Sequence, residues 1–256
     1  MLRLFGRPTS SNTQKVLWTL HELASRPKFE LILASARLGP GSDLLCEQSG
    51  GKPYGVVDTD EYRRLHPMSA IPCLVDGSLA VWESHSIVRY LAQKYGPELH
   101  LHSIDGLARC SPWMDWLLFS NFHECNHHLI DQTARTVPAQ RNMAAISRSY
   151  EGYMERFQKV EQRIEETGAF LTGEQFTIAD VVVGTELCRF SCGAQRLAKD
   201  GDMDRLSAAT AKLPNLAEYF RRLQERPAFQ EGSLQPERTH QKLEPMGPGI
   251  YQPLVP

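Results

Sequence analysis

The 256-residue chain is long enough for one large domain or for two ordinary ones, each with its own apolar core. Its 28 Lys and Arg residues nearly balance its 30 Asp and Glu residues, which excludes an overall basic field that would attract nucleic acid or an anionic membrane. Small molecules or proteins are therefore the expected partners. No apolar run has the form of a secretion signal or the ~18 residues of a membrane span, and the cysteines are scattered as reduced thiols would be. We expect a cytoplasmic protein.

The first part of the chain predicts a strand, a helix and a second strand. A short apolar run from Leu2 to Phe5 is followed by a polar loop, after which apolar residues recur at helical spacing from Val16 to Leu23. Residues 29–33 have the apolar character of another strand. This order within so short a stretch indicates a βαβ unit with a right-handed crossover.

Residues 35–60 are rich in Gly, Ser and Pro, and they predict a long loop insertion on the surface. Residues 71–75 and 79–82 then give the signal of a β-hairpin with a turn at Asp76 and Gly77. A helical pattern over 87–92 follows. Gly96 and Pro97 are expected to end that helix.

Strand signals disappear beyond about residue 104, and long helical patterns replace them, over 107–134, 140–167, 178–198 and 214–226. Thr177 and Asp180 match a capping box at the start of the third of these helices. We assign that pair to stability, because Asp180 would be buried under its own helix.

The change from strands to helices places a domain boundary near residues 96–104. The predicted domains are residues 1–97, which contain the loop insertion, and residues 104–229, which are all helical. Residues 230–256 have no periodicity and are rich in Pro and Gly near their end, so we expect an irregular tail.

Two segments after the loop insertion carry a chemical signal: SAIPCLVDG at 69–77 and WESHSIVRYL at 82–91. Pro72 stands between a loop and a strand, where an X-Pro bond is a candidate for the cis isomer, although spacing alone does not decide it. Ser84 would open a helix whose free backbone N–H groups attract a carboxylate, and Glu83 could bind an ammonium group. Taken alone, this pair could also be a plain helix cap.

The two segments closely resemble the glutathione transferase family. The resemblance covers roughly residues 2–227 and implies an α/β thioredoxin-like domain of βαβ-α-ββα order, followed by an all-α domain. In that family the residue before the cis proline pairs its backbone with the cysteinyl part of glutathione, and a Glu-Ser pair binds the γ-glutamyl end. These glutathione-binding roles fall on Ile71, Pro72, Glu83 and Ser84. Lys52, in the loop insertion, is assigned to the glycine carboxylate.

The run GRPTSSNTQKV at 6–16 stands where the family activates the glutathione thiol, and it is similar to serine-type members. Bacterial theta-related or nu-like transferases resemble it most, with some phi-class likeness. A free cysteinyl thiol has a pKa of ~8.5, so a hydrogen-bond donor and a helix N-terminus would both favour the thiolate. Ser10, Ser11 and Asn12 remain rival catalytic donors, and an ordinary N-cap cluster is the alternative. No cysteine occupies residues 7–13, so the attacking thiol should be glutathione's own.

Trp113 and Trp116 are three residues apart and share one face of a predicted helix. In the family this helix lines the pocket for the second substrate, and Arg7 is assigned to the same pocket; plain interdomain core is the open alternative for the tryptophans. Residues 123–127, HECNH, match a zinc-binding pattern, but three fixed positions match often by chance. We expect no metal.

The resemblance implies an enzyme that binds glutathione as a co-substrate, stabilises its thiolate, and conjugates or reduces a small hydrophobic electrophile in detoxification. It also implies a homodimer. The alternative is a non-enzymatic binding or scaffold protein of the same fold, in which the thiol-activating residue or the Glu-Ser pair is often lost. Both features are present here, which favours the enzyme.

Overall fold

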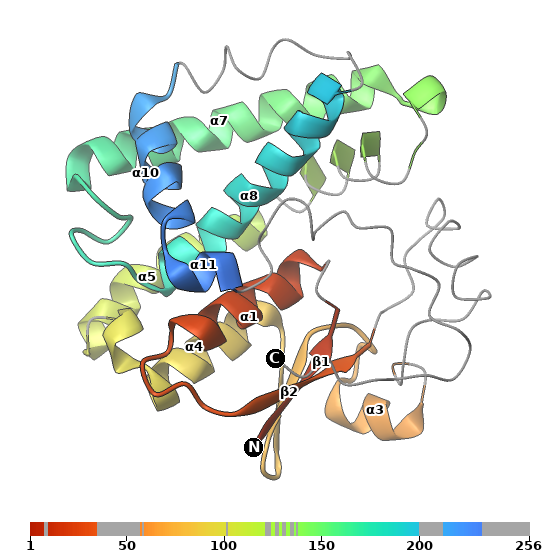
Figure 1. The fold of residues 1–256 in the computed structure, drawn as a ribbon, viewed down its shortest axis with the longest axis vertical. Helices are drawn as coiled ribbons and strands as arrows, with labels where there is room; N and C mark the ends of the chain where they lie inside the picture. The colour runs from red at the N-terminus through yellow and green to blue at the C-terminus, as the bar shows by residue number, and fades with distance from the viewer. Residues whose placement is uncertain are drawn as a thin grey trace. The chain divides into compact units, whose positions relative to one another are not determined.

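The computed structural model describes residues 1–7, 10–34, 57, 59–100, 102–120, 124–125, 128–129, 132–133, 136, 138–199 and 212–231. The chain divides into two compact units, shown as ribbons in Figure 1. The first comprises residues 1–96 and includes Glu231, and the second comprises residues 97–230. Within the described residues, no helix has both the length and the apolar character that a membrane crossing requires.

The described part of the first unit is built around a four-stranded mixed sheet with the strand order β2-β1-β3-β4. The central strand β1 (Leu2–Gly6) pairs in parallel with β2 (Phe29–Leu33) and antiparallel with β3 (Cys73–Asp76). The edge strand β4 (Leu79–Trp82) pairs antiparallel with β3. The βαβ unit and the hairpin that the sequence predicts are therefore present, although the hairpin's first strand begins at Cys73 rather than at Ile71.

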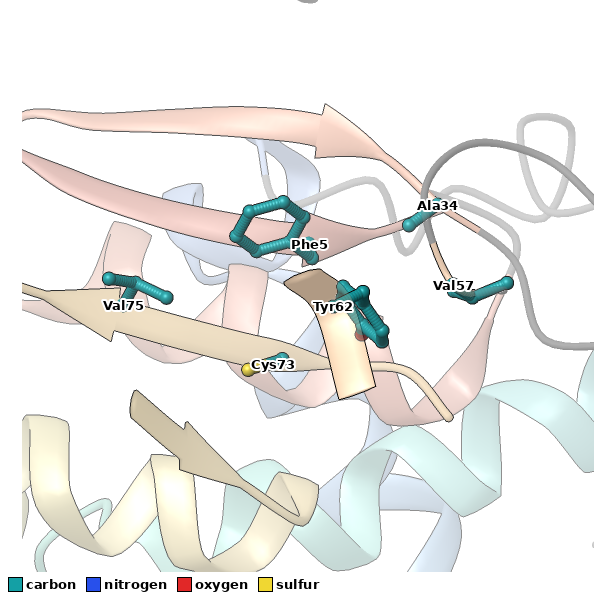
Figure 2. Packing of buried hydrophobic residues seen from close by; sticks show 6 residues of the cluster. All are labelled: Phe5, Ala34, Val57, Tyr62, Cys73 and Val75. Atoms are coloured by element: carbon teal, nitrogen blue, oxygen red, sulfur yellow. The ribbon is translucent and has the colours of Figure 1, made fainter. Parts of the chain in front are cut away.

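Helices cover both faces of this sheet. Helix α1 (Ser11–Glu22) packs against α4 (Ser84–Tyr95), and α4 also packs on β3 and β4. The short helix α3 (Asp60–Leu65) packs on β4; the family resemblance implies a helix at this place in the order, although no local pattern located its residues. Its Tyr62 contributes to a buried cluster on one face of the sheet, shown in Figure 2, which contains Phe5, Ala34, Val57, Tyr62, Cys73 and Val75.

The first turn of α1 approaches the end of β1 closely, and the sequence has a glycine where they meet. A Cβ atom built on Gly6 would lie 2.6 Å from the Thr13 side chain, which is closer than real Cβ contacts allow. Thr13 itself is fully buried. The glycine at the end of β1 therefore allows the first turn of α1 to pack closely against that strand.

The second unit is helical in its described residues. Helices α5 and α8 pack together, and α10 packs on both α7 and α8. The predicted helix over 107–134 is wrong in extent: α5 begins earlier and ends at Phe119, where Ser120 is its C-cap. Leu118 and Phe119 are exposed, so the apolar pattern at this point does not mark a buried helix face. The bounds are η1 Pro97–His100, α5 Ile104–Phe119, η3 Pro138–Gln140, α7 Met143–Thr167, α8 Ile178–Lys199, α10 Pro214–Gln224 and α11 Pro227–Glu231.

The start of α8 is closed by its own side chains. Asp180 is fully buried, and its carboxylate accepts hydrogen bonds from the backbone N–H groups of Leu171 at 2.9 Å and Thr177 at 2.8 Å. The Thr177 hydroxyl at 3.0 Å and the Tyr219 hydroxyl at 2.9 Å also donate to it. Burial raises the pKa of Asp180 to about 6 despite these donors. The predicted structural role of Asp180 thus has a geometric basis.

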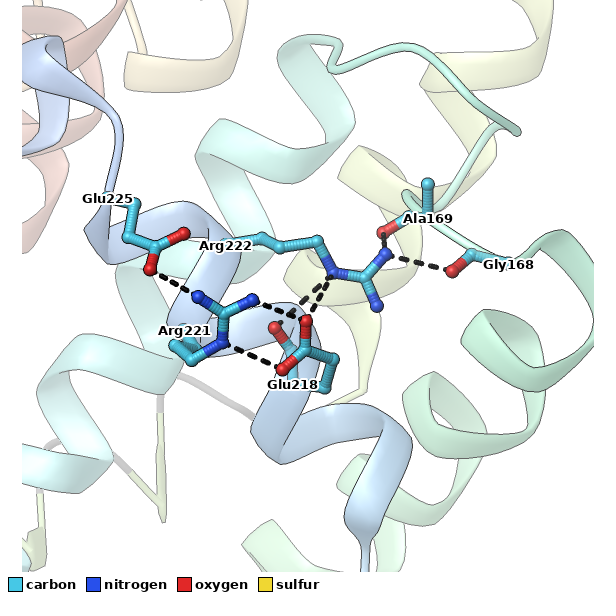
Figure 3. A network of polar contacts seen from close by, with 6 residues as sticks. All are labelled: Gly168, Ala169, Glu218, Arg221, Arg222 and Glu225. Atoms are coloured by element: carbon cyan, nitrogen blue, oxygen red, sulfur yellow. Dashed lines mark hydrogen bonds and ion pairs between the residues drawn. The ribbon is translucent and has the colours of Figure 1, made fainter.

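Two arginines of α10 make contacts of different kinds, drawn in Figure 3. Arg221 forms ion pairs with Glu218 and Glu225 on the exposed side of the helix. Arg222 also pairs with Glu218 at 3.5 Å, but in addition it donates from Nη1 to the carbonyl oxygens of Gly168 at 2.8 Å and Ala169 at 3.3 Å, where α7 ends. Arg222 therefore ties the end of one helix to the next, whereas Arg221 stays on the surface.

Candidate active site at the starts of two helices

The start of α1 holds the three residues proposed as thiol partners. Ser10 is the N-cap, and its Oγ accepts a 3.5 Å hydrogen bond from the backbone N–H of Thr13. The backbone N–H of Ser10 donates to the carbonyl oxygen of Arg7 at 3.1 Å. Ser11 and Asn12 begin the first turn, and all three predicted residues are half-buried. Because backbone N–H groups of a first turn lack intrahelical partners, this end of the helix favours an anion.

The side chain of Asn12 joins the start of α1 to the start of α4. Its Oδ1 accepts from Lys15 Nζ at 3.2 Å and from Ser84 Oγ at 3.4 Å. Asn12 and Ser84 are 72 residues apart in sequence, so the fold brings together a residue predicted for the thiol and one predicted for the γ-glutamyl end. The positive ends of two helix dipoles therefore meet beside these side chains.

Glu83 precedes α4 in an unusual backbone conformation. It is the N-cap of that helix, with φ 67° and ψ 121°, and its side chain makes no capping hydrogen bond. The residue is exposed, whereas the adjacent Ser84 is only 4% exposed. A non-glycine residue with positive φ costs of order 1–3 kcal/mol, and such residues gather at functional sites. The Glu83 carboxylate thus faces solvent instead of closing its own helix.

The loop before β3 is fixed by a residue of α3. The Ile71–Pro72 peptide bond is cis, the isomer for which the sequence made it a candidate, and Ile71 is half-buried. The Tyr62 hydroxyl donates a 2.6 Å hydrogen bond to the carbonyl oxygen of Ala70. Burial raises the pKa of Tyr62 well above its usual value, so the phenol remains a donor. Tyr62 is a positioning residue that the sequence did not reveal, because no local pattern located the residues of α3.

The side chains of His66 and Trp82 pack against each other close to Glu83. The His66 ring is only 1% exposed, and its centroid lies 5.3 Å from that of Trp82 and 6.2 Å from that of Tyr62. Burial lowers the pKa of His66, and the charge of Glu83 opposes this effect. No sequence pattern points to His66, because a single histidine after a short helix has no diagnostic spacing.

Cys73 follows the cis proline and is fully buried. Burial raises the pKa of its thiol to about 11, and its Sγ lies 3.8 Å from the carbonyl oxygen of Leu65. This thiol is therefore protonated at neutral pH and unsuited to be a nucleophile. Its state agrees with the expectation that the reacting thiol belongs to the substrate.

The other residues predicted for the site are Arg7, Lys52, Trp113 and Trp116. Lys52 lies outside the described residues. Arg7 is 8% exposed and follows β1. Trp113 and Trp116 lie on α5 in the second unit, half-buried, and their rings are 5.6 Å apart in an edge-to-face arrangement.

The zinc-like pattern at residues 123–127 lies mostly outside the described residues, since only Glu124 and Cys125 are described. Cys125 is buried, and burial raises the pKa of its thiol. Among the residues that the structure describes, no group of three or more His, Cys, Asp or Glu side chains is placed to hold a metal ion.

Comparison with known proteins agrees with this fold. Residues 4–99 match the family model of the glutathione S-transferase N-terminal domain. The glutathione S-transferase GstB of Escherichia coli is 28% identical over 236 residues, which cover 90% of this chain and 97% of that protein. Glutathione S-transferase theta-1 of Bos taurus is 28% identical over 135 residues, which cover 50% of this chain and 55% of that protein.

Solved structures extend the likeness to both units. A theta class glutathione S-transferase from Xanthomonas axonopodis pv. citri, with glutathione bound, is 27% identical, with a TM-score of 0.70 and coverage of 91% of this chain and 96% of that one. Glutathione transferase F2 of Populus trichocarpa has the same fold, with a TM-score of 0.68 at 20% identity, and covers 91% of this chain and 97% of its own.

Fold and likeness together define a thioredoxin-like domain followed by an all-helical domain, which confirms the predicted fold class. Residues 4–99 therefore match the glutathione transferase family, and the chain as a whole is similar in sequence and fold to glutathione transferases. This likeness to named transferases does not favour the alternative of a non-enzymatic scaffold.

Proposed function

We propose that the chain is a glutathione transferase whose glutathione lies across the starts of α1 and α4. The observation that supports this most is the contact of Asn12 with Ser84, which joins the predicted thiol subsite to the predicted γ-glutamyl subsite. Two helix N-termini at one place favour both the thiolate and the γ-glutamyl carboxylate. The exposed Glu83 carboxylate would bind the γ-glutamyl ammonium.

The remaining parts of glutathione have separate partners in this proposal. The backbone of Ile71 would pair with the cysteinyl part as an added strand, and the Tyr62 hydrogen bond to Ala70 supports the loop in that geometry. Lys52 remains the proposed partner of the glycine carboxylate. Arg7, Trp113 and Trp116 remain proposed contacts for a small hydrophobic electrophile.

The proposed chemistry is an attack of the glutathione thiolate on a carbon electrophile. A new C–S bond forms while the leaving group departs with the electron pair of its bond, and the proton of the thiol passes to solvent. Donors at the start of α1 act because they favour the thiolate over the thiol before the attack. The enzyme therefore needs no nucleophile of its own.

A conjugation assay with glutathione and an activated aryl halide tests the reaction. We expect turnover by the wild type and a loss of about tenfold or more in kcat/KM for one of Ser10→Ala, Ser11→Ala and Asn12→Ala, since a lost donor to a charged group costs ~1.5–3 kcal/mol. Full turnover by all three variants would show that the proposed site is wrong. Absence of turnover and of glutathione binding by the wild type would support a scaffold role.

Assembly and location are also proposals. The family resemblance implies a homodimer in the cytoplasm with a detoxification role. Sedimentation velocity of the purified chain tests the dimer: one species of twice the chain mass is expected, and a single species of chain mass at micromolar concentration would contradict it.

A further inference from the structure

Lys15 is a buried lysine beside the candidate site. It lies in α1 with only 2% of its surface exposed, and its Nζ is 3.2 Å from Asn12 Oδ1. Lysine is almost never fully buried unless its charge is paired, because removing an ammonium group from water is costly. A lysine in this position therefore needs an explanation beyond helix packing.

The contact with Lys15 fixes which way the Asn12 amide points. An ammonium group can only donate hydrogen bonds, so the amide atom that faces it must be the acceptor Oδ1 and cannot be Nδ2. The Ser84 hydroxyl approaches the same Oδ1 at 3.4 Å. Two donors thus occupy the two lone pairs of one oxygen, and the NH2 group of Asn12 is directed to the other side.

The orientation decides what Asn12 can offer to a substrate. With Oδ1 held, its Nδ2 presents two N–H donors at the N-terminal turn of α1, and no described residue accepts from them. If the amide were rotated by half a turn, its oxygen would face the substrate and would repel a thiolate. Among the three rival residues, Asn12 is the one whose donor direction is set by neighbouring side chains.

We propose that Lys15 is a positioning residue that holds Asn12 so that its Nδ2 donates to the sulfur of glutathione. This inference rests on the proposed function, because it requires glutathione to bind at the starts of α1 and α4. In it, Asn12 is the catalytic residue that contacts the substrate. Lys15 acts through Asn12, and Ser84 assists from α4.

The experiment measures the pKa of the enzyme-bound glutathione thiol from its thiolate absorbance as a function of pH. Lys15→Met keeps the apolar stem and removes the donor, and Lys15→Arg is the conservative control. We expect Lys15→Met to raise the pKa of the bound thiol by about one, which is a tenfold change in the ionisation constant. In Lys15→Arg the pKa of the bound thiol should rise by no more than about half as much, because the arginine still donates a hydrogen bond.

Binding of S-methylglutathione separates positioning from folding. This ligand has no ionisable thiol, so Lys15→Met should bind it within about twofold of the wild type if the residue only orients Asn12. An equal loss of affinity for S-methylglutathione and for glutathione would show a structural role and overturn the proposal. If Lys15→Met does not fold, Lys15→Gln, whose amide is one bond too short for the 3.2 Å contact, gives the same comparison.

A double-mutant cycle tests whether Lys15 acts through Asn12. Because Asn12→Ala removes the group that Lys15 positions, adding Lys15→Met to it should leave the thiol pKa unchanged. Additive shifts, or no shift in Lys15→Met alone, would overturn the proposal. Failure of the wild type to bind glutathione at all would instead overturn the proposed function, and with it this inference.

Discussion

The starts of α4 and α8 are both helix N-termini with an acidic residue nearby, and they use that residue in opposite ways. At α8 the Asp180 carboxylate is buried and accepts four hydrogen bonds from its own unit. At α4 the Glu83 carboxylate is exposed and makes no capping bond. A closed N-terminus contributes stability, whereas an open one keeps its charge and its backbone donors for a ligand.

The largest expected effect on stability comes from removing the Asp180 carboxylate, which closes the start of α8. Asp180→Ala leaves the donors of Leu171, Thr177 and Tyr219 buried without an acceptor, so the free energy of unfolding should fall by about 4 kcal/mol. Guanidinium unfolding followed by helical circular dichroism measures this change. Asp180→Asn, which retains one acceptor oxygen, should lose about half as much; equal stability of all three proteins would contradict the role of this carboxylate.

Ionisation of the same carboxylate should make the free energy of unfolding depend on pH. The pKa of Asp180 is raised to about 6 by burial, from ~3.9 in an unfolded chain, so the native state holds this proton more tightly. Its contribution is fully present below about pH 4 and is lost as pH rises through about 6, a change of roughly 3 kcal/mol. Unfolding of Asp180→Asn should lack this decline, and an identical decline in that variant would assign it to other groups.

The first unit should respond to pH in the opposite sense and at lower pH. Hydrogen bonds from Lys94, Tyr95 and Tyr90 lower the pKa of Asp76 to about 2. The resulting stability is present above about pH 4 and is lost as pH falls towards 2. Amide hydrogen exchange, corrected for its intrinsic pH dependence, separates the two units; Asp76→Asn should reduce the acid response of the β3–β4 hairpin alone.

The open terminus predicts a conflict between stability and function. Glycine adopts positive φ without strain, so Glu83→Gly should raise the free energy of unfolding by about 1 kcal/mol, although the residue it replaces is needed for glutathione. Thermal unfolding and glutathione titration of the same sample measure both effects. A destabilised Glu83→Gly variant that still binds glutathione would contradict this account of α4.

The smallest effects belong to α10, where the two arginines give a matched pair. Arg222→Ala removes the donors to the carbonyls of Gly168 and Ala169 as well as an ion pair with Glu218, and it should cost about 1 kcal/mol, mainly through the lost carbonyl contacts. Arg221→Ala removes only exposed ion pairs and should leave the unfolding midpoint unchanged. The reverse order in a denaturant titration would show that the surface pairs matter more than the helix-end contact.

Local sequence signals predicted much of the fold but little of the site's geometry. The second strand was placed at residues 29–33 and Ser84 at the start of a helix, because hydrophobic pattern and capping chemistry are local. The residues of α3 were not located, although the family resemblance implies a helix there, since six residues with one buried side chain carry no periodicity. The predicted helix over 107–134 extended past the cap at Ser120, because the exposed Leu118 and Phe119 continue the apolar pattern up to that cap.

The contacts within the site depend on the tertiary fold. Asn12 meets Ser84 across 72 residues, and no local pattern reports such a contact. Lysine is usually exposed, so sequence alone could not reveal that Lys15 is buried against Asn12. The sequence therefore leaves Ser10, Ser11 and Asn12 as rivals, and the proposal for Asn12 depends on contacts that only the tertiary structure supplies.

The central claim is that glutathione binds at the open helix starts of the first unit. Calorimetric titration of glutathione into the wild type, Glu83→Ala and Asp180→Asn tests it most directly, because the two variants change the open and the closed terminus separately. We predict binding by the wild type, a loss of tenfold or more (about 1.4 kcal/mol) for Glu83→Ala, and unchanged affinity for folded Asp180→Asn. Equal affinity of Glu83→Ala and the wild type would contradict the account.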